Sequence, residues 1–277
     1  MHSNEIIGIQ GIRGSFHDEV ARVYFSEASS LREFLSFGDL ALALEAGEIS
    51  HAVMAIENSI AGSIIPNYAL IDQNDLHIVG EHYLSINHHL MALEGQTIEA
   101  IEEVRSHPMA LLQCKQFFKQ FPHICLVETA DTAEEAKKIA MHKTKAVAAI
   151  ASQQAAQIYG LSVLASSIQT IKNNITRFVV LEKNKPTIEE EKINKAALKF
   201  TLDHQRGSLA AVLNMMSDCL LNLTKIQSLP VIETPGKYAF FVDVTFDTYA
   251  QFAKAKSILQ IMASEFKILG EYTNQKE

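Results

Sequence analysis

The alternation of short apolar runs with helical patterns is the feature of this sequence that most restricts its fold. The runs IIGI (6–9), HAVMAI (51–56) and AVAAIAS (146–152) consist of β-branched and small apolar residues, and a helical stretch follows each of them. Strands and helices in this order form sheets with helices packed on their faces. We therefore predict an α/β fold, and we expect ligands at the carboxyl ends of its strands.

A different pattern begins after a charged stretch, KNKPTIEEEKIN (183–194), which contains Pro186 and has little apolar surface to bury. We predict a linker at 186–194. The β-α-β-β-α-β order expected after it predicts a ferredoxin-like α+β domain over 195–277. Helices cover one face of such a sheet, so we expect the other face or an edge to pair with a second copy. The expected elements are a strand (196–202), a helix (208–220), a strand (223–229), a turn (230–236), a strand (238–246), a helix (248–266) and a strand (267–272).

Composition excludes several classes of function. The chain has 277 residues, of which 48% are apolar and 20% charged, as in soluble globular proteins. Its 24 basic and 32 acidic residues give a net charge of −8, which provides no positive field for nucleic acid or an anionic membrane. No run approaches the ~20 apolar residues that span a bilayer, and the start MHSNEIIGIQG lacks a signal-peptide pattern. We therefore expect a cytoplasmic protein with reduced cysteines.

Spacing disfavours several kinds of site. His88 and His89 are neighbours on an expected strand and point to opposite faces, so they cannot chelate one metal together. No G-x-S-x-G pattern accompanies the serine and histidine pairs at 15–17 and 106–107. The GIRGSF turn lacks the G-x-G-x-x-G spacing of a dinucleotide loop. Cys114 lies on an apolar helix face and is interpreted as a packing residue, so we expect neither a metal nor a cofactor.

Polar clusters occur in a specific order along the chain. In the first domain they are GIRGSF (11–16), AIENS (55–59) with GS (62–63), SHP (106–108) with QC (113–114), DTA (131–133) and NNITRF (173–178). Together these resemble prephenate dehydratase. In the second domain, GSLA (207–210) and LNLTKIQSLP (221–230) are similar to the amino-acid-sensing ACT module attached to that enzyme. The resemblance covers about residues 5–275.

The resemblance implies a catalytic domain (1–185) with two α/β lobes that face a cleft, similar to type II periplasmic binding proteins. NNITRF would return across the cleft into the first lobe, which would place Thr176 and Arg177 beside the Glu57-Asn58-Ser59 segment. The implied lobes are 1–78 with 165–185, and 79–164.

The implied reaction converts prephenate to phenylpyruvate with loss of water and carbon dioxide, in L-phenylalanine biosynthesis. Aromatisation drives it, so the protein must orient the substrate and supply a proton to the departing hydroxyl. The threonine of the T-R-F motif, Thr176, is implied as the direct participant. Glu57 is the alternative proton donor if its pKa rises beside a dianionic substrate, and Asn58 completes the implied catalytic set.

Substrate binding is assigned through the same resemblance. Arg177 offers a forked donor for a carboxylate, with a structural ion pair as its alternative role, and helix capping is the alternative for Ser63. Helix amino termini near residues 15–16, 63 and 106 offer further N–H groups. The implied substrate-binding residues are Ser59, Gly62, Ser63, Ser106, Gln113, Asn174, Arg177 and Phe178.

A phenylalanine feedback site is implied at an interface between two ACT modules, in a homodimer or homotetramer. Gln227 and Leu229 replace the carboxylate and the guanidinium of the usual E-S-R-P motif, and Ile12 replaces the proline of G-P-x-G-S. The implied effector-binding residues are Gly207, Ser208, Leu209, Asn222 and Leu223.

Two alternative functions stay open at this point. One is arogenate dehydratase, whose substrate carries an amine where prephenate carries a ketone, and the other is a noncatalytic regulator that senses a small molecule. Turnover of prephenate distinguishes the enzyme from the sensor. Because only about four residues precede the first expected strand, we expect an enzyme without a preceding chorismate mutase segment.

Overall fold

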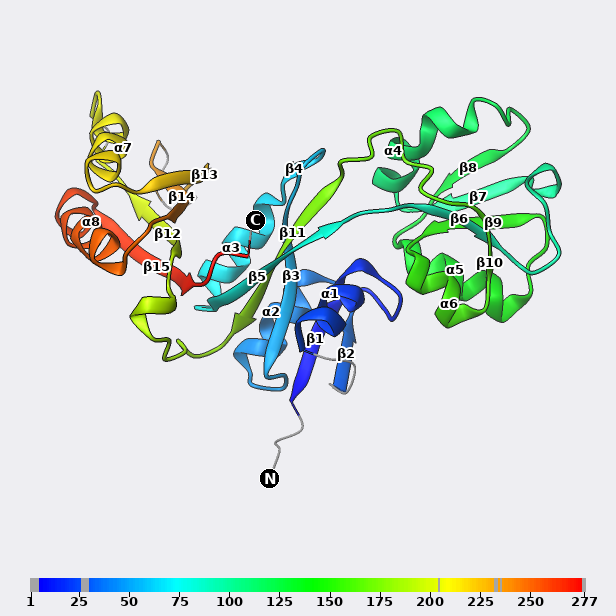
Figure 1. The fold of residues 1–277 in the computed structure, drawn as a ribbon, viewed down its shortest axis with the longest axis horizontal. Helices are drawn as coiled ribbons and strands as arrows, with labels where there is room; N and C mark the ends of the chain where they lie inside the picture. Colours follow the sequence, from blue (N-terminus) through cyan, green and yellow to red (C-terminus); the bar gives the residue numbers. More distant parts are fainter. Residues whose placement is uncertain (1–4, 26–29, 204, 232–233, 235, 276–277) are drawn as a thin grey trace.

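Two β-sheets organise the described part of the chain, which comprises residues 5–25, 30–203, 205–231, 234 and 236–275 of the computed structural model (Figure 1). The strands are β1 (Ile6–Gln10), β2 (Ser30–Phe34), β3 (His51–Asn58), β4 (Gly62–Ser63), β5 (His77–Ser85), β6 (His89–Ala92), β7 (Glu103–Ser106), β8 (Cys125–Glu128), β9 (Val147–Ala151), β10 (Ser162–Ala165), β11 (Ile175–Glu182), β12 (Lys195–Thr201), β13 (Asn222–Pro230), β14 (Tyr238–Thr245) and β15 (Glu265–Tyr272). The helices are α1 (Phe16–Phe25), α2 (Phe37–Glu45), α3 (Ile65–Gln73), α4 (Pro108–Phe118), α5 (Thr132–His142), α6 (Gln153–Tyr159), α7 (Ser208–Asp218) and α8 (Tyr249–Met262), with 3-10 turns at Ile98–Ala100 and Glu190–Lys192.

The first lobe and the C-terminal domain share one sheet. Its order is β13-β14-β12-β15-β5-β11-β3-β1-β2, with β4 paired to β3. The second lobe has its own sheet, in the order β10-β6-β9-β7-β8. Figure 1 shows the first lobe between the second lobe and the C-terminal domain. The predicted α/β class and the ferredoxin-like order of the last six elements are confirmed.

Local sequence fixes several helix ends. The side chains of Ser36, Asp131 and Ser152 each accept a hydrogen bond from a backbone N–H in the first turn of α2, α5 and α6, respectively. These caps satisfy amide groups that have no partner within the helix. Gly160 ends α6 in the left-handed conformation, at φ 64°, which glycine adopts without steric cost.

Helices cover both faces of the first-lobe sheet. On one face, Val20 and Ala21 of α1 pack against Ile9, Ala55 and Phe178 of the strands. On the other face, residues of α2 and α3 form a larger core with alternate residues of β3 and β11. Helix α1 therefore packs on one face of this sheet, and α2 and α3 pack on the other.

The chain crosses between the lobes through residues 86–88 and 166–174, next to two long antiparallel strands, β5 and β11. Pairing runs from His77 opposite Glu182 to Ser85 opposite Ile175, so all of β5 belongs to the first sheet. The first crossing thus comes about eight residues later than expected. An apolar pattern alone predicts a strand at 77–82 but does not say which sheet it joins.

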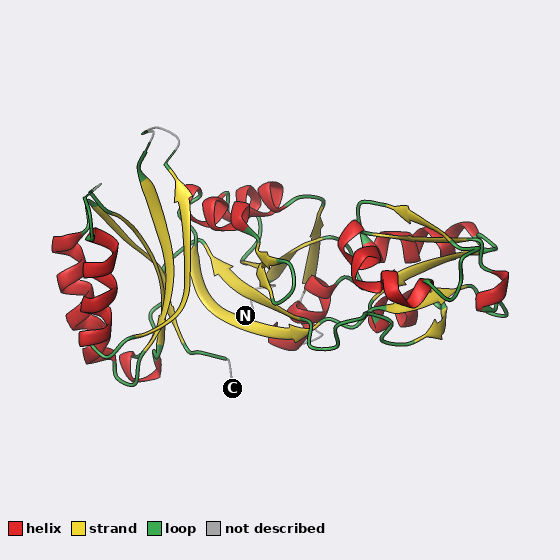
Figure 2. Ribbon diagram, turned by 90° about the horizontal axis from the view of Figure 1, so that it is seen from above, coloured by secondary structure: helices red, strands yellow, loops and turns green. Residues whose placement is uncertain are grey.

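The C-terminal domain packs against the first lobe through the face of its sheet that α7 and α8 leave open. Figure 2 shows these two helices on the outer side of the sheet. Phe241 and Tyr272 on the inner side share a core with Tyr68 and Ile71 of α3. The expected free face is therefore covered within the chain. Among the described strands, β13 is the edge of this domain.

Gly270 allows β15 to approach β5 and thus join the two parts of the large sheet. The strands pair in parallel at Gly270 and Ile78. A Cβ at position 270 would lie 2.3 Å from the carbonyl oxygen of Ile78. A side chain is therefore incompatible with this contact, which explains why glycine occupies a strand position.

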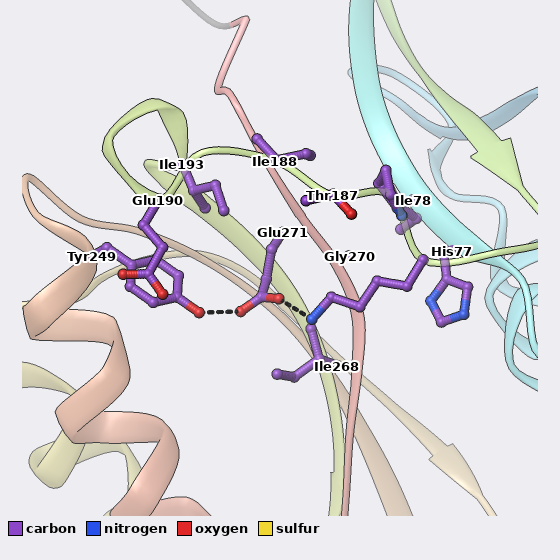
Figure 3. Close-up of a pocket in the computed structure, with 12 residues that line it drawn as sticks. His77, Ile78, Thr187, Ile188, Glu190, Ile193, Tyr249, Ile268, Gly270 and Glu271 are labelled. Atoms are coloured by element: carbon purple, nitrogen blue, oxygen red, sulfur yellow. Dashed lines mark hydrogen bonds and ion pairs between the residues drawn. The ribbon is translucent and has the colours of Figure 1, made fainter.

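The charged segment before the C-terminal domain lies against that domain and is not a free spacer. Lys185 Nζ contacts Glu271 at 2.6 Å, and Tyr249 Oη donates to the same carboxylate at 3.0 Å (Figure 3). Ile188 and Ile193 face the same cavity, which has a volume of about 360 Å³. Ion pairing, which composition does not reveal, holds the segment in place.

Four strands or α-helices were not expected from the sequence: β2, α2, β4 and β7. The β2 sequence SLREF is mostly exposed at the edge of the sheet and has no burial pattern that would identify it. The helical pattern at 18–27 predicts the first helix, and its last residues, 26–27, lie outside the described residues. So do positions 232–233 and 235 of the expected turn.

The described ranges contain no helix long and apolar enough to cross a membrane, the longest being α8 with 14 residues. They also contain no group of three or more His, Cys, Asp or Glu side chains arranged to hold a metal ion.

Candidate active site

A cavity of about 450 Å³ lies between the two lobes. The first lobe contributes Asn58 from β3 and Thr176 from β11, together with Asn174, which precedes β11. The second lobe contributes Gln113 from α4 and Asp131 from the cap of α5. Residues at strand ends of one lobe and on or next to helices of the other therefore meet at one place.

Alternation along β11 decides which of its side chains reach the cavity. Asn174, Thr176 and Phe178 line the cleft, whereas Ile175 and Arg177 line a separate cavity against the C-terminal domain. Successive strand residues point to opposite faces. Thr176 and Arg177 therefore cannot bind the same ligand, although they are neighbours in sequence.

A β-bulge makes the corresponding selection on β3. The register pairs Thr176 with Asn58 and Arg177 with Glu57, then shifts so that Phe178 pairs with Ala55. The extra residue in β3 places Ala55 and Asn58, three positions apart, on the same face. Asn58 consequently faces the cleft, and Glu57 faces the C-terminal domain.

Hydrogen bonds fix the orientation of the Asn58 amide. Its Oδ1 accepts from the backbone N–H groups of Ile60 (3.0 Å) and Ala61 (2.9 Å). Its Nδ2 must therefore be the donor, and it donates to Asn174 Oδ1 at 2.7 Å and to Thr176 Oγ1 at 2.9 Å. Because the Thr176 oxygen already accepts from Asn58, its own proton is available to a ligand.

The same network continues into the second lobe. Asn174 Nδ2 donates to Gln113 Oε1 at 2.9 Å, and His88 Nε2 lies 2.8 Å from that oxygen. Since an amide oxygen can only accept, His88 carries its proton on Nε2. The network thus connects Thr176 and Asn58 to α4 across the crossing segments of the chain.

Three helix amino termini face the cavity, those of α1, α4 and α5. Ser15 and Phe16, His107 and Met109, and Thr132 line it at these ends. Backbone N–H groups without helical partners, together with the helix dipoles, favour anions at such positions. A chain with a net charge of −8 can therefore hold an anionic ligand without placing Arg177 in the cleft.

Ionisable groups in the cleft are perturbed by burial. Desolvation lowers the pKa of His17 to about 3, and its Nε2 accepts a hydrogen bond from the backbone N–H of Ala55. Burial also lowers the pKa of His88 and raises the pKa of Asp131. His17 and His88 are therefore neutral near pH 7 and leave anion binding to the backbone amides.

The sequence-based expectation for Arg177 and Glu57 differs from their positions in the structure. Arg177 Nε contacts Glu81 at 2.7 Å, and its other nitrogens contact Asp243 and Tyr272. Glu57 pairs with Lys225 at 3.1 Å. Both face a cavity of about 550 Å³ between the first lobe and the C-terminal domain, because of the alternation and the bulge described above.

The other residues expected to bind substrate divide between several positions. Gln113, Asn174 and Phe178 line the cleft. Ser106 is fully buried and donates to the carbonyl of Ile150, and Ser59 donates to the carbonyl of Asn173. Gly62 and Ser63 form β4, which pairs with β3. The hydroxyls of Ser59 and Ser106, which were expected to bind substrate, are therefore already bonded to backbone carbonyls.

The expected effector residues occupy two places in the C-terminal domain. Ser208 and Leu209 line a cavity of about 180 Å³, and Gly207 precedes them with φ 85°. Asn222 and Leu223 begin β13, where the Asn222 amide contacts the Thr245 hydroxyl at 3.4 Å. Among the described residues, the cavity lined by Ser208 and Leu209 does not include Asn222 or Leu223.

The cleft residues that were not selected from the sequence include His17, His107 and Asp131. The sequence feature that could have identified them is their position at or next to a predicted helix start that follows a strand. His107 and Asp131 cap α4 and α5, and His17 lies in the first turn of α1.

Comparison with known proteins identifies the family. The family model described as prephenate dehydratase matches residues 7–186. The chain belongs to the prephenate dehydratase family. An Arabidopsis thaliana relative, arogenate dehydratase/prephenate dehydratase 2, chloroplastic, is 35% identical over 96% of this chain and 72% of that protein.

Solved structures agree with this fold over nearly the whole chain. The structure of GqqA, described as a novel type of quorum quenching acylases, has a TM-score of 0.88 at 26% identity and covers 98% of both chains. The prephenate dehydratase of Arthrobacter aurescens in complex with L-Phe has a TM-score of 0.86 and covers 97% of this chain and 90% of that chain. Its identity is 24%, so this second likeness concerns the fold alone.

Proposed function

We propose that this chain is a prephenate dehydratase that converts prephenate to phenylpyruvate, carbon dioxide and water. The observation that carries the proposal is the network in which Asn58 Nδ2 donates to Thr176 Oγ1 at the wall of the cleft between the lobes. Family membership over residues 7–186 supports it, since both residues lie within the matched range.

The reaction needs a bound dianion and one proton. As the ring carboxylate leaves as carbon dioxide, the electron pair of the breaking C–C bond moves through the ring and expels the hydroxyl group. That group takes up a proton and departs as water. The helix amino termini in the cleft hold the carboxylates, and their fixed dipoles need no reorganisation as charge develops.

Thr176 is proposed as the donor to the departing hydroxyl. A hydroxyl that already accepts from Asn58 is a better donor, because hydrogen bonds in a chain polarise one another. Glu57 was the alternative acid, but its carboxylate points toward Lys225 on the opposite face. A direct proton transfer from Glu57 to a ligand in the cleft is therefore not supported.

Acyl transfer, the reaction class of an acylase such as GqqA, is less well supported by this cleft. It requires a nucleophile activated by a base. The contacts described for Thr176 Oγ1 and His17 Nε2 are with Asn58 and with the backbone of Ala55, respectively. These contacts do not form the nucleophile and base pair that acyl transfer needs.

The test is phenylpyruvate formation from prephenate by the purified protein, compared with arogenate. Thr176→Val keeps the shape of the side chain and removes the donor, so we expect kcat to fall about 10² to 10³-fold. Thr176→Ser is the matched control and should retain activity within about tenfold. Full activity in Thr176→Val would remove Thr176 from the mechanism, and absence of turnover in the unmodified protein would favour the sensor.

Glu57→Gln separates the two proton donors. If Glu57 supplied the proton, this variant would abolish the basic limb of the pH–rate profile. With Thr176 as donor, we expect the basic limb of the Glu57→Gln profile to fall at the same pH as in the unmodified protein, although kcat itself changes. Loss of the limb in Glu57→Gln would contradict the assignment to Thr176.

We further propose that the C-terminal domain is an ACT module that binds phenylalanine between two copies in a cytoplasmic homodimer or homotetramer. The βαββαβ fold and the motifs at 207–209 and 222–223 support this. Because the two motifs are separate within one chain, a site made from both needs a second copy. Phenylalanine titration followed by activity and by sedimentation tests it, and absence of both inhibition and binding would reject it.

A further inference from the structure

Two pairs of neighbouring residues connect the cleft to the C-terminal domain. Asn58 and Thr176 pair across β3 and β11 and line the cleft. Glu57 and Arg177 are the next pair in the same register and line the cavity against the C-terminal domain. Each cleft residue thus has a direct chain neighbour that faces the other domain.

Arg177 is held almost entirely by buried groups. Its side chain is 4% exposed, and its Nε contacts Glu81, which is fully buried, at 2.7 Å. Its remaining nitrogens contact Asp243 of β14 and the Tyr272 hydroxyl of β15, the latter at 2.8 Å. Lys195 of β12 contacts both Glu81 oxygens at 2.9 Å. Two strands of the C-terminal domain therefore contact Arg177 directly, and a third contacts its partner Glu81.

The second connection joins Glu57 to β13. Lys225 Nζ lies 3.1 Å from the Glu57 carboxylate and 5.1 Å from the centre of the Tyr68 ring. The Lys225 side chain is 7% exposed and that of Glu57 39% exposed. Desolvation lowers the pKa of Lys225, which the Glu57 charge opposes. The pair consequently contains a buried cation whose orientation depends on Glu57.

We propose that Asp243 and Lys225, both in the C-terminal domain, are positioning residues for the cleft. They hold the side chains of Arg177 and Glu57 and, through the backbone of β11 and β3, set the separation of Thr176 and Asn58. The inference deepens the proposed function and rests on it for its kinetic test.

Strand geometry explains why the effect reaches the cleft. The Cα atoms of adjacent residues are a fixed ~3.8 Å apart, so movement of Arg177 moves the backbone of Thr176. The Thr176 hydroxyl is held to Asn58 by a single 2.9 Å hydrogen bond, which a shift between β11 and β3 would lengthen. Misplacement of a catalytic group by about 1 Å can cost about 10²-fold in rate.

A contribution to stability does not by itself explain why these charged side chains are buried together. Arg177 and Lys195 balance Glu81 and Asp243, so the buried cluster is neutral. Apolar side chains of similar volume often replace such a cluster without loss of stability. Directional contacts, in contrast, fix the place of one strand relative to another, as positioning requires.

Asp243→Asn is the first variant of the test, and Val242→Ala is its matched control. Val242 is the adjacent residue of β14, is buried, and faces the core beneath α7 and α8. Below the unfolding transition, we expect Asp243→Asn to lower kcat at least tenfold with KM changed less than threefold. Val242→Ala should keep kcat within twofold. Asp243→Asn with a kcat within twofold of the unmodified protein would overturn the proposal.

Lys225→Met supplies the test if Asp243→Asn does not fold. The Glu57 carboxylate that this variant leaves is partly exposed, so folding should be retained. We expect kcat to fall three- to tenfold, and Lys225→Arg should restore it. Glu57→Gln combined with Lys225→Met should cost no more than the worse single variant, because the two residues act as one unit. The proposal would be contradicted if the fold-losses of kcat multiplied in the double variant, or if Lys225→Met lost no activity.

Amide hydrogen exchange gives a readout that does not depend on turnover. Without substrate, exchange in residues 173–178 should rise at least fivefold in Asp243→Asn and stay unchanged in Val242→Ala. Failure of the unmodified protein to convert prephenate would reject the proposed function, while faster exchange would still support positioning. Equal exchange in both variants would reject the positioning role.

Discussion

Protonation of His17 should destabilise the fold at acid pH, and replacing it should remove part of that sensitivity. The ring is buried between Phe37 and Phe178, with ring centres at 5.4 and 5.0 Å, and it accepts a hydrogen bond from the backbone of Ala55. Desolvation lowers its pKa to about 3 from an ordinary value of 6.5. The folded protein therefore resists protonation of this group, and the unfolded chain does not.

The magnitude follows from the two pKa values. A group whose pKa is depressed on folding contributes stability above its unfolded pKa, and that stability is lost as pH falls toward the folded value. At pH 5 the unfolded state binds nearly one proton at this group, about 0.7 more than at pH 7, and the folded state excludes it. The corresponding loss is RT times the logarithm of about 25, or about 2 kcal/mol.

Urea unfolding followed by circular dichroism at pH 7 and pH 5 measures this loss. His17→Gln should lose about 2 kcal/mol less than the unmodified protein between these pH values. His142→Gln, at the exposed end of α5, is the control and should lose as much as the unmodified protein. Equal losses in His17→Gln and the unmodified protein would refute the reasoning.

Three further predictions concern a strand contact, the thiols and the amide network. Gly270→Ala should lower the free energy of unfolding in urea by about 1–3 kcal/mol and expose the linker to proteolysis, because its Cβ would meet the Ile78 carbonyl oxygen. An unchanged free energy of unfolding would contradict this. Maleimide should modify exposed Cys125 at least tenfold faster than Cys114, whose pKa burial raises to about 12, and equal rates by mass spectrometry would count against it. Asn58→Asp cannot donate to the oxygens that the amide now holds, so kcat should fall about 10²-fold, and an active variant would argue against the network.

Local patterns predicted most of the elements because they depend on neighbouring residues. The buried run at 146–152 became β9, and the helical pattern at 108–118, which predicts a helix with these bounds, became α4. The polar cluster at the start of β11 predicts cleft residues, and Asn174 and Thr176 of this cluster line the cavity between the lobes. Edge elements such as β2 were missed because exposed strands lack an apolar pattern.

The positions of Arg177 and Glu57 show the limit of local reasoning. Alternation within the strand already indicates that Arg177 faces away from Thr176, and this signal could have been used. Glu57 could not be placed in this way, because alternation from Ala55 would have put it in the cleft. The β-bulge reverses that assignment, and it exists only when β3 is paired with β11.

The sequence by itself determined the α/β class, most of the strands and helices and the family, since periodicity and motif spacing are properties of short segments. Only the tertiary structure decided which face each polar residue occupies and what it contacts. Register, the bulge and the packing of the C-terminal domain on the first lobe are long-range contacts. Their energies depend on residues far apart in the chain, so no local pattern records them.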